Sequence, residues 1–160
     1  METGKKIYDV FDAVNSSNRN NIAMILKCND GSEKTCSYGE MFEQIDIMAN
    51  KLCSIGIKPG MRTVIVAQSS PVWNIAYLAC LKLKSATVLV DSSLDTADIV
   101  KLIKKSDAAC MMTTDKLFEE LASTFDADMM EIPVLDIEHN GELFSGSALT
   151  VKQPSIVIDE

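Results

Sequence analysis

The stretch that decides the fold reads Gly56-Ile57-Lys58-Pro59-Gly60-Met61-Arg62-Thr63-Val64-Ile65-Val66-Ala67. Pro59 presets the first central torsion of a type II turn, and Gly60 follows at the position that needs a positive φ. Residues 63–67 then form an uninterrupted apolar and β-branched run, which is typical of a central strand buried on both faces. The segment therefore predicts a turn that leads the chain into the interior of a parallel sheet.

The same alternation of apolar runs and amphipathic segments continues along the chain. Further strands are expected over 86–90, 108–113 and 132–136, with strand centres about 23 residues apart, the length of one strand, one helix and two short loops. Helices are expected between them: residues 72–84, apolar on nearly all sides and so predicted to be buried, a segment capped by Asp95, and residues 115–125. The pattern predicts an α/β fold with a mainly parallel sheet flanked by helices.

The N-terminal part has a different pattern. Residues 5–21 show apolar residues at helical spacing, and Asn29-Asp30-Gly31-Ser32 predicts a hairpin turn between strands over 22–28 and 34–36. Ser37 and Glu40 have the spacing of a capping box, so a helix is expected to begin there and to end near Gly56. An N-terminal helix and a β-hairpin thus precede the parallel sheet.

Pro133 and the region beyond Asp136 mark the end of the sheet. Because proline cannot donate a ladder hydrogen bond, the strand over 132–136 is expected at an edge. Beyond Asp136 the periodicity is lost, and residues 138–153 are predicted to be a loop. We therefore treat 1–160 as one unit: 5–36 helix plus hairpin, 37–136 βα units, and 137–160 loop.

Composition limits the function classes. The chain has 15 Lys plus Arg against 23 Asp plus Glu, a net charge of −8, which argues against a nucleic-acid partner. The first six residues are polar and open no signal peptide, and no apolar run is long enough for a membrane span, so a cytoplasmic location is expected. The five cysteines form no C-x-x-C pair and are interpreted as reduced thiols: Cys28, Cys36, Cys53, Cys80 and Cys110.

Few residues carry recognisable chemistry. His139 is the only histidine, and in its polar surroundings it is interpreted as a solvated turn residue rather than a base. No G-x-S-x-G elbow, G-x-G-x-x-G fingerprint or P-loop occurs, and the cysteines and the histidine lack metal-ligand spacing. We therefore assign no catalytic, substrate-binding, cofactor-binding or metal-binding residue from these patterns.

Two local features have both a functional and a structural interpretation. Asp91-Ser92-Ser93 follows a predicted strand at its carboxyl end, where α/β folds bind ligands, but a polar loop before a helix is the simpler reading. Trp73 and Tyr77 share one face of a predicted helix, where core packing is favoured over a ligand site.

Five segments, taken together, resemble a known family. They are Ser37-Tyr38-Gly39-Glu40-Met41, the turn and strand from Gly56 to Val66, Ser69-Ser70-Pro71-Val72-Trp73, Leu81 to Asp91, and Ser106-Asp107-Ala108. In this order they are similar to the boxes of the adenylate-forming (AMP-binding) superfamily of acyl-CoA synthetases, luciferases and peptide-synthetase adenylation domains. The start of the predicted helix at Ser70 is most like the acyl-CoA synthetases. Lys84 stands where the family usually has glycine, Leu89 where it has proline, and Met61 where it often has aspartate.

The resemblance implies a truncated N-terminal subdomain of an ATP-dependent ligase. The whole protein would convert a carboxylic acid and ATP to an acyl-adenylate and pyrophosphate, and would pass the acyl group to CoA or a carrier phosphopantetheine. ATP and Mg are thus implied for the whole protein. The family's phosphate loop, the glutamate that holds magnesium and the mobile lysine have no matching position in these 160 residues. The 160 residues alone are expected to be inactive, to contact the remainder of their own chain, and to self-associate through uncovered apolar surface.

Two other interpretations stay open. The chain is alternatively a stand-alone, non-catalytic interaction module with this fold, or a small flavodoxin-like nucleotide-binding protein. The coding sequence downstream of Glu160 separates the ligase from the module, and nucleotide or flavin affinity of this chain alone tests the third interpretation.

Overall fold

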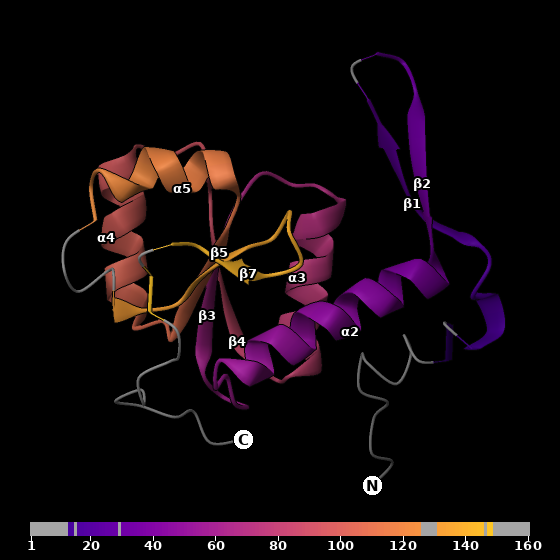
Figure 1. The fold of residues 1–160 in the computed structure, drawn as a ribbon, viewed down its shortest axis with the longest axis horizontal. Coiled ribbons are helices and arrows are strands. Elements are labelled where there is room, and N and C mark those ends of the chain that lie inside the picture. The colour runs from indigo at the N-terminus through magenta and orange to yellow at the C-terminus, as the bar shows by residue number, and fades with distance from the viewer. Residues whose placement is uncertain (1–12, 15, 29, 126–130, 146, 149–160) are drawn as a thin grey trace, which may run out of the picture.

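The computed structural model describes residues 13–14, 16–28, 30–125, 131–145 and 147–148. Its elements are β1 (Ile22–Lys27), β2 (Glu33–Ser37), α2 (Tyr38–Ser54), β3 (Arg62–Val66), α3 (Pro71–Lys82), β4 (Ala86–Val90), α4 (Thr96–Ser106), β5 (Cys110–Thr113), α5 (Asp115–Ala122), β6 (Val134–Asp136) and β7 (Glu142–Leu143). The expected α/β fold with a mostly parallel sheet and a separate hairpin is confirmed (Figure 1). Among the described residues, none of the helices has the length and apolar character of a membrane span.

The large sheet has five strands in the order β4-β3-β5-β6-β7. β3 pairs in parallel with both β4 and β5, and β5 pairs in parallel with β6. Side chains of β3 alternate between two cores: Ile65 faces α2 and α3, whereas Val64 and Val66 face α4 and α5. All three are fully buried, as expected for a central strand covered on both faces (Figure 1).

The turn before β3 has the predicted geometry. Gly60 has a φ of +79°, and the Met61 N–H donates to the Lys58 carbonyl at 3.1 Å, which closes the turn. The Gly60 N–H donates to the Lys84 carbonyl at 2.9 Å, and the Ala86 N–H donates to the Met61 carbonyl at the same distance. The turn therefore sets the register between β3 and β4.

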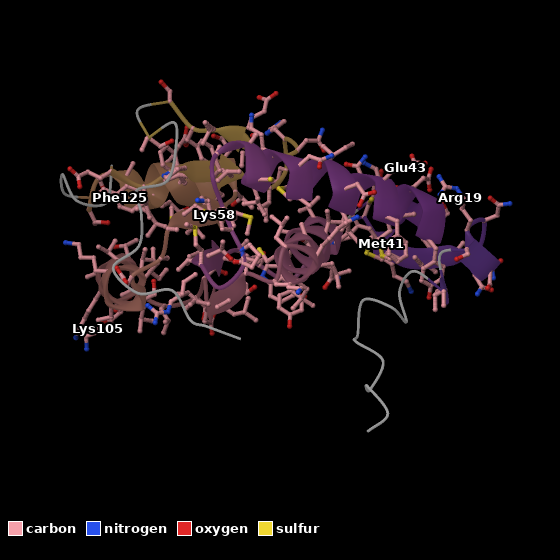
Figure 2. All side chains as sticks on the ribbon, turned by 90° about the horizontal axis from the view of Figure 1, so that it is seen from below. Arg19, Met41, Glu43, Lys58, Lys105 and Phe125 are labelled. Atoms are coloured by element: carbon pink, nitrogen blue, oxygen red, sulfur yellow. The ribbon has the colours of Figure 1, made fainter. Side chains whose placement is uncertain are left out.

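The N-terminal hairpin stands apart from the sheet and is joined to α2 (Figure 1). β1 and β2 pair antiparallel, as predicted. Ser37 and Glu40 form the predicted capping box at the start of α2, with the Glu40 N–H donating to Ser37 Oγ at 3.2 Å and the Ser37 N–H donating to Glu40 Oε2 at 2.8 Å. Arg19 pairs with Glu43, one turn further along the helix (Figure 2). The predicted helix over 5–21 lies largely outside the described residues, of which 13–14 and 16–18 are helical.

Three expectations about the sheet and its helices need correction. The strand of Pro133 is not an edge, because β6 lies between β5 and β7 and Pro133 itself precedes the strand, where its carbonyl accepts from the Met111 N–H. The predicted loop over 138–153, and with it the loop over 137–160, is wrong at residues 142–143, where β7 pairs antiparallel with β6. Asp95 stands at the N-cap of α4, but its side chain makes no capping hydrogen bond.

Candidate functional site

The order of the strands creates a crevice at the carboxyl edge of the sheet. The chain leaves β3 toward α3 on one face and leaves β5 toward α5 on the opposite face, yet β3 and β5 are neighbours. In doubly wound sheets such a point, where adjacent connections diverge, is where ligands bind. The four parallel strands have the order 2-1-3-4 in their own numbering, as in flavodoxin-like sheets.

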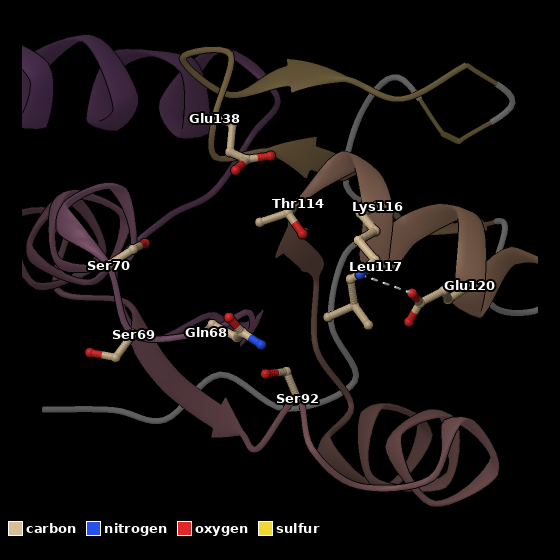
Figure 3. A pocket seen from close by; sticks show the side chains of 9 residues that line it. All are labelled: Gln68, Ser69, Ser70, Ser92, Thr114, Lys116, Leu117, Glu120 and Glu138. Carbon is tan, nitrogen blue, oxygen red and sulfur yellow. Dashed lines mark ion pairs between the residues drawn. The ribbon is translucent and has the colours of Figure 1, made fainter. Parts of the chain in front are cut away.

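A cavity of about 330 Å³ lies in this crevice (Figure 3). Its lining comes from the segments that follow β3, β4, β5 and β6, and is mostly polar: Gln68, Ser69, Ser70, Ser92, Thr114, Lys116, Leu117, Glu120 and Glu138. We call it the switch-point cleft. Hydroxyl and amide groups suit hydrogen bonding to a small polar molecule.

Local hydrogen bonds fix the loops that line the cleft. Ser70 caps α3 by accepting from the Trp73 N–H at 3.3 Å, and Pro71 occupies the first helical turn. Asp91 accepts from the Ser93 N–H at 2.8 Å, and hydrogen bonds from the backbone and the side chain of Ser93 lower the pKa of Asp91. The residues of the Asp91-Ser92-Ser93 segment therefore have different roles: Asp91 fixes the loop, and of the three only Ser92 lines the cleft.

The charged groups of the cleft are unequal in number. Lys116 Nζ lies 4.0 Å from Glu120 Oε1 in an exposed pair within α5, and Glu138 adds a second carboxylate from the loop after β6 (Figure 3). A cleft with one paired cation and two carboxylates does not attract a polyphosphate.

His139 lies beside the cleft but does not line it. Its Nδ1 is 2.6 Å from Oδ2 of the buried Asp136, and hydrogen bonding and charge from that carboxylate raise the pKa of His139. Asp136 also accepts from the Glu138 N–H at 2.8 Å. The imidazole is largely exposed and joins no nucleophile in the described residues, so the geometry agrees with a turn residue.

The other candidate residues serve packing. Trp73 and Tyr77 stack with their ring centroids 5.6 Å apart and lie, partly buried, against the core under α2 and α3. Burial raises the pKa of Cys80 to about 11 and the pKa of Cys110 well above its usual value, so neither thiol is suited to nucleophilic chemistry. All five cysteines are free, and Cys53 is exposed.

The cleft residues that sequence reasoning missed share one signal. Gln68, Thr114, Lys116 and Glu138 follow the carboxyl ends of β3, β5 and β6, as Ser92 follows β4. The rule that α/β folds bind ligands at strand carboxyl ends applies to each of these loops. Applied to every predicted strand rather than only to residues 86–90, it would have found them.

Comparison with known proteins decides the family. The model of the AMP-binding enzyme family matches residues 11–156. The chain belongs to the AMP-binding enzyme family. An acetyl-coenzyme A synthetase from Chlorobaculum tepidum is 29% identical over 109 residues, which cover 68% of this chain and 16% of that protein. The similarity inferred from the five sequence segments is thus confirmed.

Other members of the family show the same partial overlap. Tyrocidine synthase 3 from Brevibacillus parabrevis is 29% identical over 124 residues, which cover 78% of this chain and 2% of that protein. The structure of an O-succinylbenzoate coenzyme A synthetase from Bacillus subtilis, in complex with ATP and magnesium ion, has a TM-score of 0.64 at 18% identity, covering 93% of this chain and 35% of that chain. This chain therefore spans a minor part of the family members it matches.

The described residues do not by themselves fit the ATP and magnesium that the family implies. Within the described ranges, no three His, Cys, Asp or Glu side chains are grouped to hold a metal ion. In the switch-point cleft the two carboxylates Glu120 and Glu138 outnumber Lys116, and Ser70 already caps the helix that begins there. No step involving these groups is therefore assigned to residues of this chain.

Proposed function

We propose that this chain is the N-terminal part of an AMP-forming, acyl-CoA synthetase-like ligase. The whole protein would couple a carboxylic acid to ATP, forming an acyl-adenylate and pyrophosphate, and would then transfer the acyl group to the thiol of CoA or of a carrier phosphopantetheine with release of AMP. The observation that carries the proposal is the family match over residues 11–156. The acetyl-coenzyme A synthetase relatives favour CoA as the acceptor.

The described residues would act as a scaffold and supply one wall of ligand contacts. The two buried cores fix the loops after β3, β4 and β5, and these loops bring Gln68, Ser92 and Thr114 to one cleft. In the whole protein these groups would donate and accept hydrogen bonds with an uncharged polar part of a ligand, because the lining offers hydroxyls and an amide but no unpaired cation. We therefore expect the 160-residue chain to form no acyl-adenylate alone.

ATP–pyrophosphate exchange with a panel of carboxylic acids tests the proposal. The complete product of the reading frame should catalyse acid-dependent exchange, and the 160-residue chain should not exceed a no-enzyme control. Exchange by the 160-residue chain would contradict its proposed inactivity. No exchange by the folded complete product with any acid would favour the interaction module, and tight flavin or nucleotide binding by the 160-residue chain would favour the flavodoxin-like alternative.

A matched pair of serine variants tests the role of the cleft. In the active protein, Ser92→Ala should raise the KM of the ligand that contacts the cleft, because a hydrogen bond to it is lost. Ser123→Ala is the control, since the Ser123 hydroxyl donates to the Glu120 carbonyl at the end of α5 and Ser123 does not line the cleft. Equal kinetics for the two variants would remove the cleft from the proposal.

A further inference from the structure

β4 leaves one side of the sheet open. Among the described residues no strand pairs with its outer side. The Ala86 N–H donates to the Met61 carbonyl, so in this parallel ladder Ala86 and Val88 direct their amides and carbonyls toward β3. The alternation leaves the N–H and carbonyl groups of Thr87 and Leu89 on the outer side. An unpaired edge of this kind is a template for a further strand.

The sequence of this edge lacks the features that normally prevent pairing. Ala86–Val90 contains no charge and no proline, and the strand has no described bulge. Leu89 is 50% exposed on the face that carries α3, although it stands in the strand interior. An exposed leucine at an unprotected edge leaves apolar surface for another strand to cover.

A groove runs beside this edge on the face that carries α4. It has a volume of about 420 Å³ and is lined by Val88 of the strand and by Leu102 and Lys105 of the helix, among others. Asp98, Leu102 and Lys105 are spaced four and three residues apart, so they share one face of α4. This stripe has an acid at its N-terminal end, a 42% exposed leucine in the middle, and a base at its C-terminal end; Figure 2 shows Lys105 at the periphery of the molecule.

We propose that a second copy of this chain covers the edge, through antiparallel pairing of β4 with β4 about a two-fold axis at Val88. In this register Thr87 lies opposite Leu89 of the second copy, and both residues have outward backbone groups, so each pair exchanges two hydrogen bonds. The result is a continuous sheet across two copies. The interface is isologous and closes on itself, so the assembly stops at a dimer.

The charges of α4 favour a second copy over other strands. α4 contacts both β3 and β4, so its axis lies over the gap between them, and a two-fold at the edge places the two α4 helices about 10 Å apart, which is normal packing distance. Because the helices run antiparallel, Leu102 meets its counterpart, and Asp98 of each copy faces Lys105 of the other. A uniformly acidic or basic strand would meet a like charge at one end of the stripe.

Sedimentation velocity over a range of concentrations tests the proposal on the 160-residue chain. The unmodified chain should show a monomer–dimer equilibrium, and Leu102→Lys should raise the dimer dissociation constant about tenfold or more, because a buried apolar contact becomes a like-charge pair. Leu89→Lys should act in the same direction from the other face. Ile47→Lys is the matched control: Ile47 is 45% exposed on α2, away from the edge, and should leave the dimer unchanged.

A charge exchange makes the assignment specific. Lys105→Glu and Asp98→Lys should each weaken the dimer, whereas an equimolar mixture of the two variants should form heterodimers as tight as the unmodified dimer. Circular dichroism confirms that each variant is folded. Three outcomes would overturn the proposal: a monomer at every concentration, an oligomer larger than a dimer, or a dimer that is lost with Ile47→Lys but kept with Leu102→Lys. A monomer would mean that another partner, or another part of the same chain, pairs with the β4 edge.

Discussion

Replacing Lys84 by glycine should stabilise the protein, and the reason lies in how α3 ends. The Ser85 N–H donates to the Cys80 carbonyl and the Lys84 N–H to the Leu81 carbonyl, both at 3.0 Å, which is the hydrogen-bond pattern of a Schellman motif. Lys84 occupies the left-handed position of this motif with a φ of +54°. Glycine is the usual residue there because it has no Cβ to clash with the backbone.

The magnitude follows from two opposing terms. A left-handed conformation costs an L-residue about 1–2 kcal/mol, and glycine removes this cost. Glycine also increases the conformational entropy of the unfolded chain, which offsets about 0.4–1 kcal/mol. The free energy of unfolding of Lys84→Gly should therefore rise by about 0.5–1 kcal/mol. At Gly60, with a φ of +79°, valine should lower it by about 1–3 kcal/mol.

Urea unfolding compares these variants. With an m-value of about 2 kcal/mol/M, the midpoint should rise by a few tenths of a molar for Lys84→Gly and fall by about 1 M for Gly60→Val. Lys84→Ala is the control, since it removes the lysine side chain but keeps the Cβ at a positive φ. Equal midpoints for Lys84→Gly and Lys84→Ala would show that the left-handed backbone stores no strain, and an unchanged midpoint for Gly60→Val would refute the type II turn before β3.

Two further predictions concern titratable groups. His139 is the only histidine, so its NMR resonance reports the Asp136 contact directly: its midpoint should lie above 6.5 and return to about that value in Asp136→Asn. Because the pKa of His139 is raised in the folded state, its contact with Asp136 contributes its full stabilisation below pH 6.5, and this contribution disappears as the pH rises through the folded-state pKa of His139. A His139 titration midpoint below 6.5 would contradict the contact. A thiol reagent should modify the exposed Cys53 rapidly in the native protein and should reach the buried Cys80 and Cys110 only upon unfolding, whereas rapid native labelling of either would contradict their burial.

The parts of the fold that sequence analysis predicted correctly depend on short-range physics. β-Branched residues over 63–66 mark a strand buried on both faces, and the turn at Pro59 and Gly60 needs only local torsions. The capping box of Ser37 and Glu40 is likewise closed within four residues. Such features can be recognised without knowledge of which segments later meet.

The errors arise where packing decides. The prediction that α3 is buried holds only in part: Ile75, Ala76, Ala79 and Cys80 are buried, whereas its other apolar residues are half-buried between α2 and the sheet, and Asn74 and Lys82 are exposed. β7 has two residues, which is too short for an alternating pattern, and its pairing with β6 provides the signal that the sequence lacks. Pro133 indicates an edge strand only if it lies within the strand, and β6 begins after it, at Val134.

The candidate site depends on one event that no local pattern encodes. Sequence order places β4 after β3, but it does not say that the chain then crosses β3 and adds β5 on the other side. Only that crossover makes β3 and β5 neighbours, and only their adjacency joins the loop at Gln68 to the loop at Thr114. The residues of the cleft are common polar types, so their meaning comes from strand order rather than composition.

The same crossover determines the free edge. Because β5, β6 and β7 are all added beyond β3 on the side away from β4, nothing in the described chain returns to pair with Thr87 and Leu89. The switch-point cleft on one side of β3 and the open edge of β4 on the other are therefore two consequences of the same strand order. A sheet that had continued past β4 would have covered this edge, but it would also have separated the loops that form the cleft.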